Sequence, residues 1–220
     1  MTKLILAIVM IVTSTFANAQ LKGSGKTITK NFDYTNFDKV YFEDLDGKLE
    51  VEIGKSWSIS VTVDDNLESL LAFKENPTEH ELTVYLKGNK NNRMYIENSN
   101  IKIKITMPEA TVIRNDSNAN LVINGVIGRY FRLENFSNST SKVLGTVDEL
   151  EVKNTGNGNS NLAELKAKKA NIICRGNGNT TVNVSEEIVA TVSGNGNITN
   201  KGNANYDGKS SRTGNGNLLK

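Results

Sequence analysis

The second half of the chain repeats a short asparagine-rich motif at intervals of about twenty residues. Gly-Asn-Gly-Asn occupies residues 156–159, 176–179, 194–197 and 214–217, and weaker copies stand at 117–120 and 137–140. A fixed interval of this length indicates one structural unit per repeat, each stacked on its neighbours. The intervals between the central asparagines are 20, 19, 20, 18 and 20 residues, and these residues are Asn118, Asn138, Asn157, Asn177, Asn195 and Asn215.

Apolar residues keep the same phase between the motifs. In the repeat that leads to Gly176, the positions six, four and two residues earlier are Ala170, Ile172 and Cys174, and they alternate with polar or outward-facing positions. An apolar residue also follows five positions after each of the first four central asparagines, as Leu162 follows Asn157. Alternation with a period of two predicts a strand with one buried face. Each repeat therefore supplies one strand before the motif and one after it, with the motif at the corner.

Strands that recur at this interval can stack in parallel as the coils of a solenoid, about 4.8 Å apart. The first half of the chain also alternates, at 49–53, 57–63, 82–86 and 101–107. We therefore predict an all-β fold, a single-stranded parallel β-helix of about 20 residues per coil, over residues 31–220. Residues 20–30 are expected to form a flexible leader. Asp65 and Glu68 have capping-box spacing, so residues 66–73 form either a helical turn or an irregular loop.

Glycine and asparagine suit the corners of such coils for separate reasons. Glycine permits a positive φ at a tight bend, and asparagine tolerates the same region better than most residues. Stacked asparagines can also form an amide ladder, in which each side chain donates to one coil and accepts from the next. The predicted structural ladder comprises the six central asparagines and the motif glycines Gly156, Gly158, Gly176, Gly178, Gly194, Gly196, Gly214 and Gly216.

The first 19 residues have the pattern of a secretory signal peptide. Lys3 precedes an apolar run from Leu4 to Val12, and Ala17-Asn18-Ala19 places small residues before a cleavage site. The apolar run is too short to cross a bilayer, which takes about 20 residues. We therefore expect cleavage after Ala19 and an exported protein (periplasmic, cell-surface or secreted) with no membrane span in the mature chain.

The composition and the few reactive residues argue against several functions. Basic and acidic residues nearly balance (26 Lys and Arg against 24 Asp and Glu), so no nucleic-acid partner is expected. One histidine and one cysteine are too few for a zinc site, and Cys174 fits a buried apolar position. We also expect no cofactor.

Three further positions carry side chains that could form a site. Arg175 would lie beside Thr155, Ser193 and Thr213 on neighbouring coils, without a carboxylate or lysine to form a catalytic pair, so a solvated arginine is the better interpretation. His80 lies in a polar turn and is expected to be a surface histidine. Asp64-Asp65-Asn66 offers oxygen ligands for calcium but lacks the spacing of an EF-hand loop.

The order of these features resembles a known family. The signal peptide is followed by Phe32, Phe37 and Val40, then by Gly-x-Leu-x-Val-x-Ile-Gly at 47–54, and then by the repeated corners. Over residues 31–220 this pattern is similar to the bacterial head GIN domain family of auto-transporter adhesins. The resemblance implies a right-handed parallel β-helix, like that of pectate lyases but without catalytic residues, and a role in adhesion. The sequence departs from the family pattern where serines replace glycine corners at 117–119 and 137–139.

Two functions follow as hypotheses. The first is a non-catalytic, exported binding or adhesion module that presents a rigid β-solenoid surface to carbohydrate or to a cell-surface protein. The alternative is a polysaccharide-active enzyme, a lyase or hydrolase, on a pectate-lyase-like β-helix. The sequence leaves the oligomeric state open.

Overall fold

The computed structural model describes residues 21–220, except residues 93 and 95, as one sheet of 15 strands wound into a solenoid. Within these residues there is no α-helix, and two short 3-10 helices, η1 (Glu68–Leu70) and η2 (Lys90–Asn92), lie between strands. The strands are β1 (Thr27–Phe32), β2 (Lys39–Glu43), β3 (Lys48–Ile53), β4 (Ser58–Asp64), β5 (Leu71–Asn76), β6 (Glu81–Leu86), β7 (Lys102–Met107), β8 (Val112–Asp116), β9 (Asn120–Asn135), β10 (Ser141–Asn154), β11 (Ser160–Gly176), β12 (Thr180–Gly194), β13 (Ile198–Asn200), β14 (Ser211–Gly214) and β15 (Leu218–Leu219).

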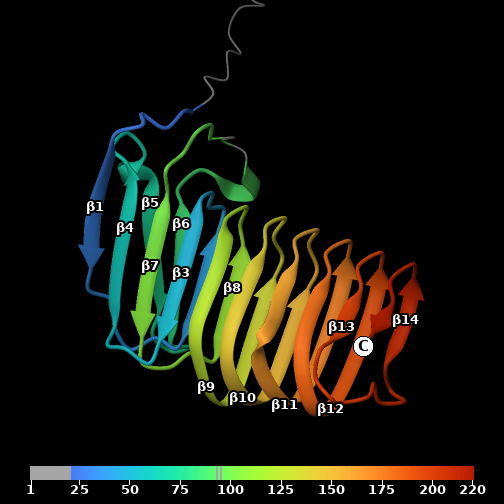
Figure 1. Ribbon diagram of the computed structural model, residues 1–220. Coiled ribbons are helices and arrows are strands. Elements are labelled where there is room, and N and C mark those ends of the chain that lie inside the picture. Colours follow the sequence, from blue (N-terminus) through green and yellow to red (C-terminus); the bar gives the residue numbers. More distant parts are fainter. Residues whose placement is uncertain (1–20, 93, 95) are drawn as a thin grey trace, which may run out of the picture.

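The long strands β9 to β12 each pass through two layers of the solenoid, as Figure 1 shows. Their first halves continue the layer β1-β4-β7-β3 and lead to β13 and β15, whereas their second halves continue β5-β6-β2-β8 and lead to β14. The strand halves turn between layers near Gly125 and Gly145, where the pairing register shifts. One continuous apolar core fills the space between the two layers.

The regular coils run in parallel and in phase. Leu133 of β9 pairs with Val152 of β10, which pairs with Ile172 of β11, and the column ends at Ala190 of β12. All four side chains have no exposed surface. Because one coil cannot cover its own apolar side, this column forms only when neighbours stack. The predicted all-β solenoid with coils of about 20 residues is thus confirmed, with about five turns.

The first coils are not stacked in the order of the sequence. Strand β2 pairs in parallel with β6 on one side and with β8 on the other. Strand β3 likewise lies between β7 and β9. The coil formed by β2 and β3 is therefore inserted between a coil made later in the chain, β6–β7, and the first regular coil, β8–β9.

An antiparallel cap closes the N-terminal end. Strand β4 pairs antiparallel with β7 and with β1, and β5 pairs antiparallel with β6. The ring of Phe73 packs against Phe32 and Tyr34, with centroids 4.6 and 5.0 Å apart.

The segment 21–30 differs from the flexible leader that the sequence predicts for residues 20–30. The backbone of 27–30 belongs to β1, and Gly23 N donates to Glu97 O at 2.9 Å. The predicted signal peptide, residues 1–19, lies outside the described residues.

The predicted helical turn at residues 66–73 is only partly present. A single 3-10 turn spans η1, and the chain enters β5 at Leu71. Leu67, not Asp65, occupies the N-cap position, and no side chain caps the turn. The side chain of Asp65 instead accepts a hydrogen bond from Ser24 Oγ at 2.7 Å. The capping-box interpretation was therefore wrong, because Asp65 binds the N-terminal segment.

The carboxylate of Asp64 ties the N-terminal segment to the end of β4. Its side chain is fully buried; Oδ1 accepts from Gly25 N at 2.9 Å and from Asn100 Nδ2 at 3.1 Å, and Oδ2 accepts from Asn100 N at 2.6 Å. Burial alone would raise the pKa of Asp64, but the bonds from Asn100 and Gly25 together outweigh burial and hold the pKa below its ordinary value. Such a carboxyl stabilises the fold above its unfolded pKa of about 3.9 and loses this contribution as the pH falls through the folded pKa.

We therefore expect Asp64→Asn to lower stability at neutral pH and to flatten the acid limb of the stability profile. The amide cannot be protonated, and its Nδ2 would face the donors of Asn100 or Gly25. Urea unfolding of both proteins from pH 7 to about pH 3 measures the difference. Asp33→Asn, at an exposed position, should keep the wild-type slope. Equal slopes for Asp64→Asn and wild type would contradict this account.

The C-terminal coil is short and is held by polar contacts. Tyr206 Oη donates to Ile198 O at 3.0 Å or to Leu219 O at 2.8 Å, and Arg212 Nη1 donates to Asn217 Oδ1 at 2.7 Å. Strands β14 and β15 each pair along one edge only, with β12 and β13. Across the part of the chain that the structure describes, no helix is long and apolar enough to cross a membrane.

Candidate functional site

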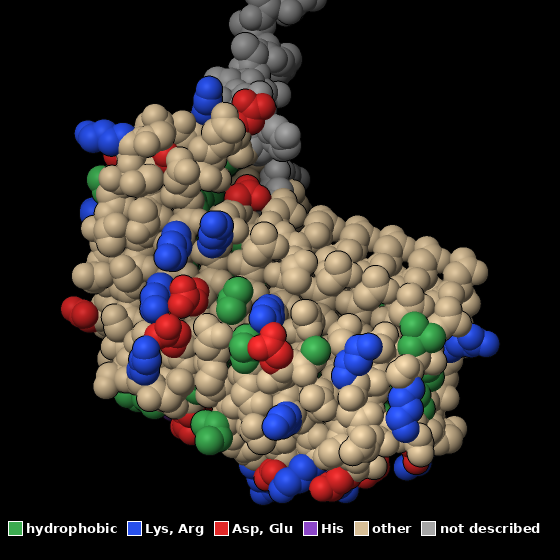
Figure 2. Space-filling model, in the orientation of Figure 1, with side chains coloured by type: hydrophobic (Ala, Val, Ile, Leu, Met, Phe, Trp, Pro, Cys, Tyr) green, Lys and Arg blue, Asp and Glu red, His purple; other side chains and the backbone are tan. Residues whose placement is uncertain are grey.

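The structure brings the six central asparagines together in one row along an edge of the solenoid. Each amide nitrogen donates to the amide oxygen of the preceding coil, so that all the amides point in the same direction. From Asn138 to Asn118 the Nδ2–Oδ1 distance is 3.4 Å, and the following pairs are 3.0 Å for Asn157 to Asn138, 2.8 Å for Asn177 to Asn157, 2.7 Å for Asn195 to Asn177 and 3.0 Å for Asn215 to Asn195. Figure 2 shows this edge as a band without charged side chains.

Asp46 lies at the end of the row where Asn118, its first asparagine, stands. Burial raises the pKa of Asp46, and the hydrogen bond from Asn118 limits that rise. Within the row, the aligned amides strengthen one another because each hydrogen bond polarises the next. The repeat pattern missed Asp46, which lies in an earlier corner of different sequence.

A second row of asparagines lies beside the first. The side-chain oxygens of Asn159, Asn179 and Asn197 each accept from the backbone nitrogen two residues after the central asparagine of the next coil. These N–O distances are all 2.9 Å. The last member, Asn217, accepts from Arg212 instead. Each Gly-Asn-Gly-Asn motif therefore contributes one asparagine to each row.

A third column of asparagines is buried inside the corner. Asn115, Asn135 and Asn154 occupy equivalent positions in β8, β9 and β10, and none has more than a trace of exposed surface. Asn154 Nδ2 donates to Gly158 O at 3.1 Å and to Thr180 Oγ1 at 3.2 Å. In the next two coils the column continues with Cys174 and Val192. Cys174, predicted to be buried, donates through Sγ to Gly178 O at 3.1 Å.

The motif glycines lie where backbone of the previous coil leaves no room for a side chain. A Cβ on Gly178 would lie 1.9 Å from Gly158 O, and one on Gly196 would lie 2.1 Å from Gly178 O. Gly176 and Gly194 also have positive φ, 127° and 135°. The remaining motif glycines, Gly156, Gly158, Gly214 and Gly216, likewise face carbonyl oxygens at 2.6 Å or less.

Two corners carry serine in place of the leading glycine. Ser137 Oγ donates to Asn135 Oδ1 at 2.8 Å and accepts from Ser139 N at 3.1 Å. Ser117 makes the same pair of contacts with Asn115 and Ala119. The serines thus support the buried asparagines, and these corners turn without a residue of positive φ.

A polar cleft of about 560 Å³ opens where the asparagine row begins. Its walls are the corners at 43–44, 116–118 and 136–138, and the segment 85–91, which comprises the end of β6 and the loop after it. The buried Asn89 holds this segment against the first coil, since its Nδ2 donates to Asp44 O at 2.7 Å. Asn91 N donates to Asp44 Oδ1, also at 2.7 Å. The cleft therefore has walls that are fixed by backbone and side-chain hydrogen bonds.

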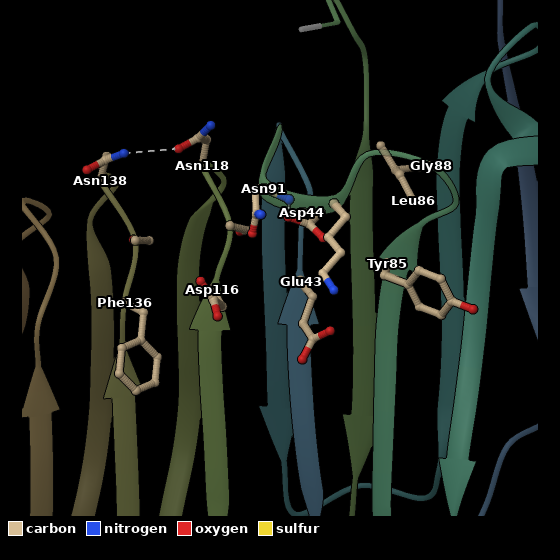
Figure 3. A pocket seen from close by; sticks show the side chains of 13 residues that line it. Glu43, Asp44, Tyr85, Leu86, Gly88, Asn91, Asp116, Asn118, Phe136 and Asn138 are labelled. Atoms are coloured by element: carbon tan, nitrogen blue, oxygen red, sulfur yellow. Dashed lines mark hydrogen bonds between the residues drawn. The ribbon is translucent and has the colours of Figure 1, made fainter. Parts of the chain in front are cut away.

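Carboxylates, amides and aromatic rings meet in this cleft. Figure 3 shows Glu43 and Asp116 between the rings of Tyr85 and Phe136, with the amides of Asn118 and Asn138 at the rim. Glu43 and Asp116 are direct partners on the neighbouring strands β2 and β8.

The Arg114 side chain contacts two of these residues, Asp116 and Phe136. Arg114 Nη2 donates to Asp116 Oδ2 at 2.8 Å, and the Arg114 guanidinium carbon lies 4.7 Å from the Phe136 ring centroid. Arg114 thus fixes both the charge and the orientation of this wall. The cleft therefore presents hydrogen-bond donors, acceptors and aromatic ring faces side by side.

The three other candidates from the sequence lie away from this cleft. Arg175 is exposed on β11. His80 is exposed in the turn before β6, where Nδ1 lies 3.0 Å from Asn36 O. Asp64 and Asp65 are engaged with the N-terminal segment, and the described residues hold no group of three or more His, Cys, Asp or Glu side chains that could bind a metal.

Solved structures share this fold. A putative adhesin from Bacteroides fragilis is 22% identical over 90% of this chain and 99% of its own, with a TM-score of 0.66. A putative lipid binding protein from Parabacteroides distasonis is 20% identical over 90% and 98%, with a TM-score of 0.52. A putative adhesin from Parabacteroides merdae is 18% identical over 90% and 98%, with a TM-score of 0.51. No curated protein matches the chain.

The model of one protein family matches residues 36–204, which is most of the chain and includes the cleft, β2 to β13 and all but the last corner motif. It is the same family that the order of the sequence motifs resembles. The chain belongs to the family described as putative auto-transporter adhesin, head GIN domain.

Proposed function

We propose that this protein is an exported, non-catalytic binding module for adhesion, and that it holds carbohydrate in the cleft between Tyr85 and Phe136. The observation that carries the proposal is the combination of carboxylates, amides and two aromatic rings around one cleft of about 560 Å³. Sugars present adjacent hydroxyl groups and apolar ring faces, which carboxylate and amide groups and aromatic side chains can bind. Membership of an adhesin family and the predicted signal peptide support the same role.

The cleft is better suited to binding than to turnover. Glycoside hydrolysis needs two carboxyl groups that are free to exchange protons or to attack. In the cleft, Asp44 accepts from Asn91 and Asp116 accepts from Arg114, so that two of the three carboxylates that line the cleft hold its walls, and Glu43 is the third. A lipid chain, suggested by the description of one structural neighbour, would need an apolar cavity. Most of the residues that line this cleft are polar or charged.

The proposal is tested with the purified mature protein on an array of neutral and acidic polysaccharides, with product analysis of every bound sample. We expect retention without release of shorter chains. For a bound polysaccharide, Tyr85→Ala and Glu43→Gln should each weaken binding about tenfold, which corresponds to about 1.4 kcal/mol. Glu186→Gln, at an exposed site on β12 outside the cleft, is the matched control and should bind like wild type.

Two results would overturn the proposal. Release of oligosaccharides would favour the enzyme. Retention that survives both cleft substitutions, or retention only of protein partners in a parallel assay, would place the binding surface elsewhere or with another class of ligand.

A further inference from the structure

Four of the six asparagines in the exposed row are followed by glycine. These pairs are Asn157-Gly158, Asn177-Gly178, Asn195-Gly196 and Asn215-Gly216. Asparagine is chemically labile, and a following glycine leaves the backbone nitrogen open to approach the side-chain amide carbon. All four asparagines are exposed to solvent. The exposed row thus offers four sites of spontaneous deamidation with the same Asn-Gly pair, and differences among them must come from how each is held.

Stacking restrains three of the pairs on both sides. Asn157, Asn177 and Asn195 each donate to the preceding coil and accept from the following one. The glycine nitrogens that would attack are also engaged; Gly158 N donates to Ser137 O at 2.9 Å and Gly196 N to Gly176 O at 3.1 Å. Reaction requires the nitrogen and the amide carbon to reach a near-attack geometry, which these contacts oppose.

Asn215 is held from one side only. Its Nδ2 donates to Asn195 Oδ1, but among the residues that the structure describes no side chain donates to its own oxygen. Its corner joins β14 and β15, of which β14 is fully exposed, and in the described sheet each of these two strands pairs with one neighbour. Exposed segments with so few neighbours open at a lower free energy than the body of a fold. Gly216 N, which donates to Gly194 O at 2.9 Å, is released by such opening.

We propose that Asn215 is a deamidation site of the folded protein, and that stacking protects Asn157, Asn177 and Asn195. In the reaction Gly216 N attacks Cγ of Asn215; the N–Cγ bond forms, the Cγ–Nδ2 bond breaks, and ammonia leaves with the proton of Gly216 N. Water then opens the cyclic imide to aspartate or isoaspartate. The product has a carboxylate in place of the donor to Asn195 Oδ1, so the row loses its last hydrogen bond and gains a negative charge.

The test is a time course of the folded protein at 37 °C and mildly alkaline pH, followed by tryptic peptide mapping. The sequence separates the sites well, because Asn215 falls in the peptide 213–220, Asn157 in 154–166, and Asn177 and Asn195 in 176–201, where fragmentation distinguishes them. We expect Asn215 to convert about tenfold faster than Asn157 or Asn177 in the folded protein. In denaturing urea the four sites should convert at similar rates.

A variant separates coil opening from intrinsic reactivity. Arg212→Ala removes the hydrogen bond to Asn217 Oδ1 and should accelerate conversion of Asn215 while leaving Asn157 unchanged. Equal rates at Asn215 and Asn157 in the folded protein would overturn the proposal. A second result would also overturn it: a rate at Asn215 that Arg212→Ala does not change and that exceeds the rate at Asn157 by the same factor in urea as in the folded protein.

Discussion

Replacing Gly178 with alanine should lower the melting temperature of this protein by roughly 10 °C. The added Cβ would lie 1.9 Å from Gly158 O and 2.8 Å from its carbonyl carbon, both backbone atoms of the preceding coil. Backbone in a stacked coil cannot move aside as a flexible side chain can, so two coils must separate locally. Overpacking of this kind costs about 3 kcal/mol, which is large for a domain of this size. Thermal unfolding followed by circular dichroism measures the change.

Gly208→Ala is the matched control. Gly208 lies in an exposed turn, has no positive φ, and a Cβ there would meet nothing within 4 Å. The same chemical change should therefore leave the melting temperature nearly unaltered. Equal melting temperatures for the two variants would mean that the backbones of neighbouring coils do not approach each other this closely.

Asn135→Ala should cost about 3 kcal/mol of unfolding free energy. The Asn135 side chain is fully buried; its oxygen accepts from Ser137 Oγ at 2.8 Å and from Ser141 Oγ at 3.2 Å, and its nitrogen donates to Ser160 Oγ at 3.1 Å. Alanine would leave three buried hydroxyl groups short of a partner and a small cavity besides. Urea unfolding at pH 7 gives the difference in free energy directly.

The exposed row supplies the control for this experiment. Asn157 makes two amide hydrogen bonds of 3.0 and 2.8 Å, but it lies in solvent, where water can replace them. Asn157→Ala should therefore cost less than about 1 kcal/mol. If Asn157→Ala proved as destabilising as Asn135→Ala, burial would not be what separates the two columns.

The regular coils were predictable because two independent periods coincide there. The interval of about twenty residues fixes the corners, and the alternation of buried and exposed residues fixes the strands between them. The first coils show only the alternation, and a strand such as β2 has the same pattern whichever strands flank it. Its place between β6 and β8 therefore could not be inferred. Strand β1 was missed because its residues are mostly exposed and show no regular alternation.

The candidate cleft could not be predicted from the sequence for a related reason. Its walls come from segments near residues 43, 88, 117 and 137, which are brought together only by the non-sequential stacking. Residues 87–92 could be identified only as a polar loop, and Asp46 as a lone acid. The rows of asparagines and glycines, in contrast, could be listed residue by residue, since each coil repeats the same local geometry. Three coils use a buried asparagine at the inner corner, whereas Cys174 and Val192 replace it later.

The insertion of the β2–β3 coil has a consequence for the order in which the chain can fold. A chain delivered from its N-terminus presents β2 and β3 well before β6, β7, β8 and β9, their partners on both sides. These two strands must wait, with open edges, until about the first 135 residues are available. Each later coil, from β10 onward, meets a finished template and can add to it at once. Nucleation of the fold thus requires more than the N-terminal half of the chain to assemble out of sequence, and the later coils then add one after another.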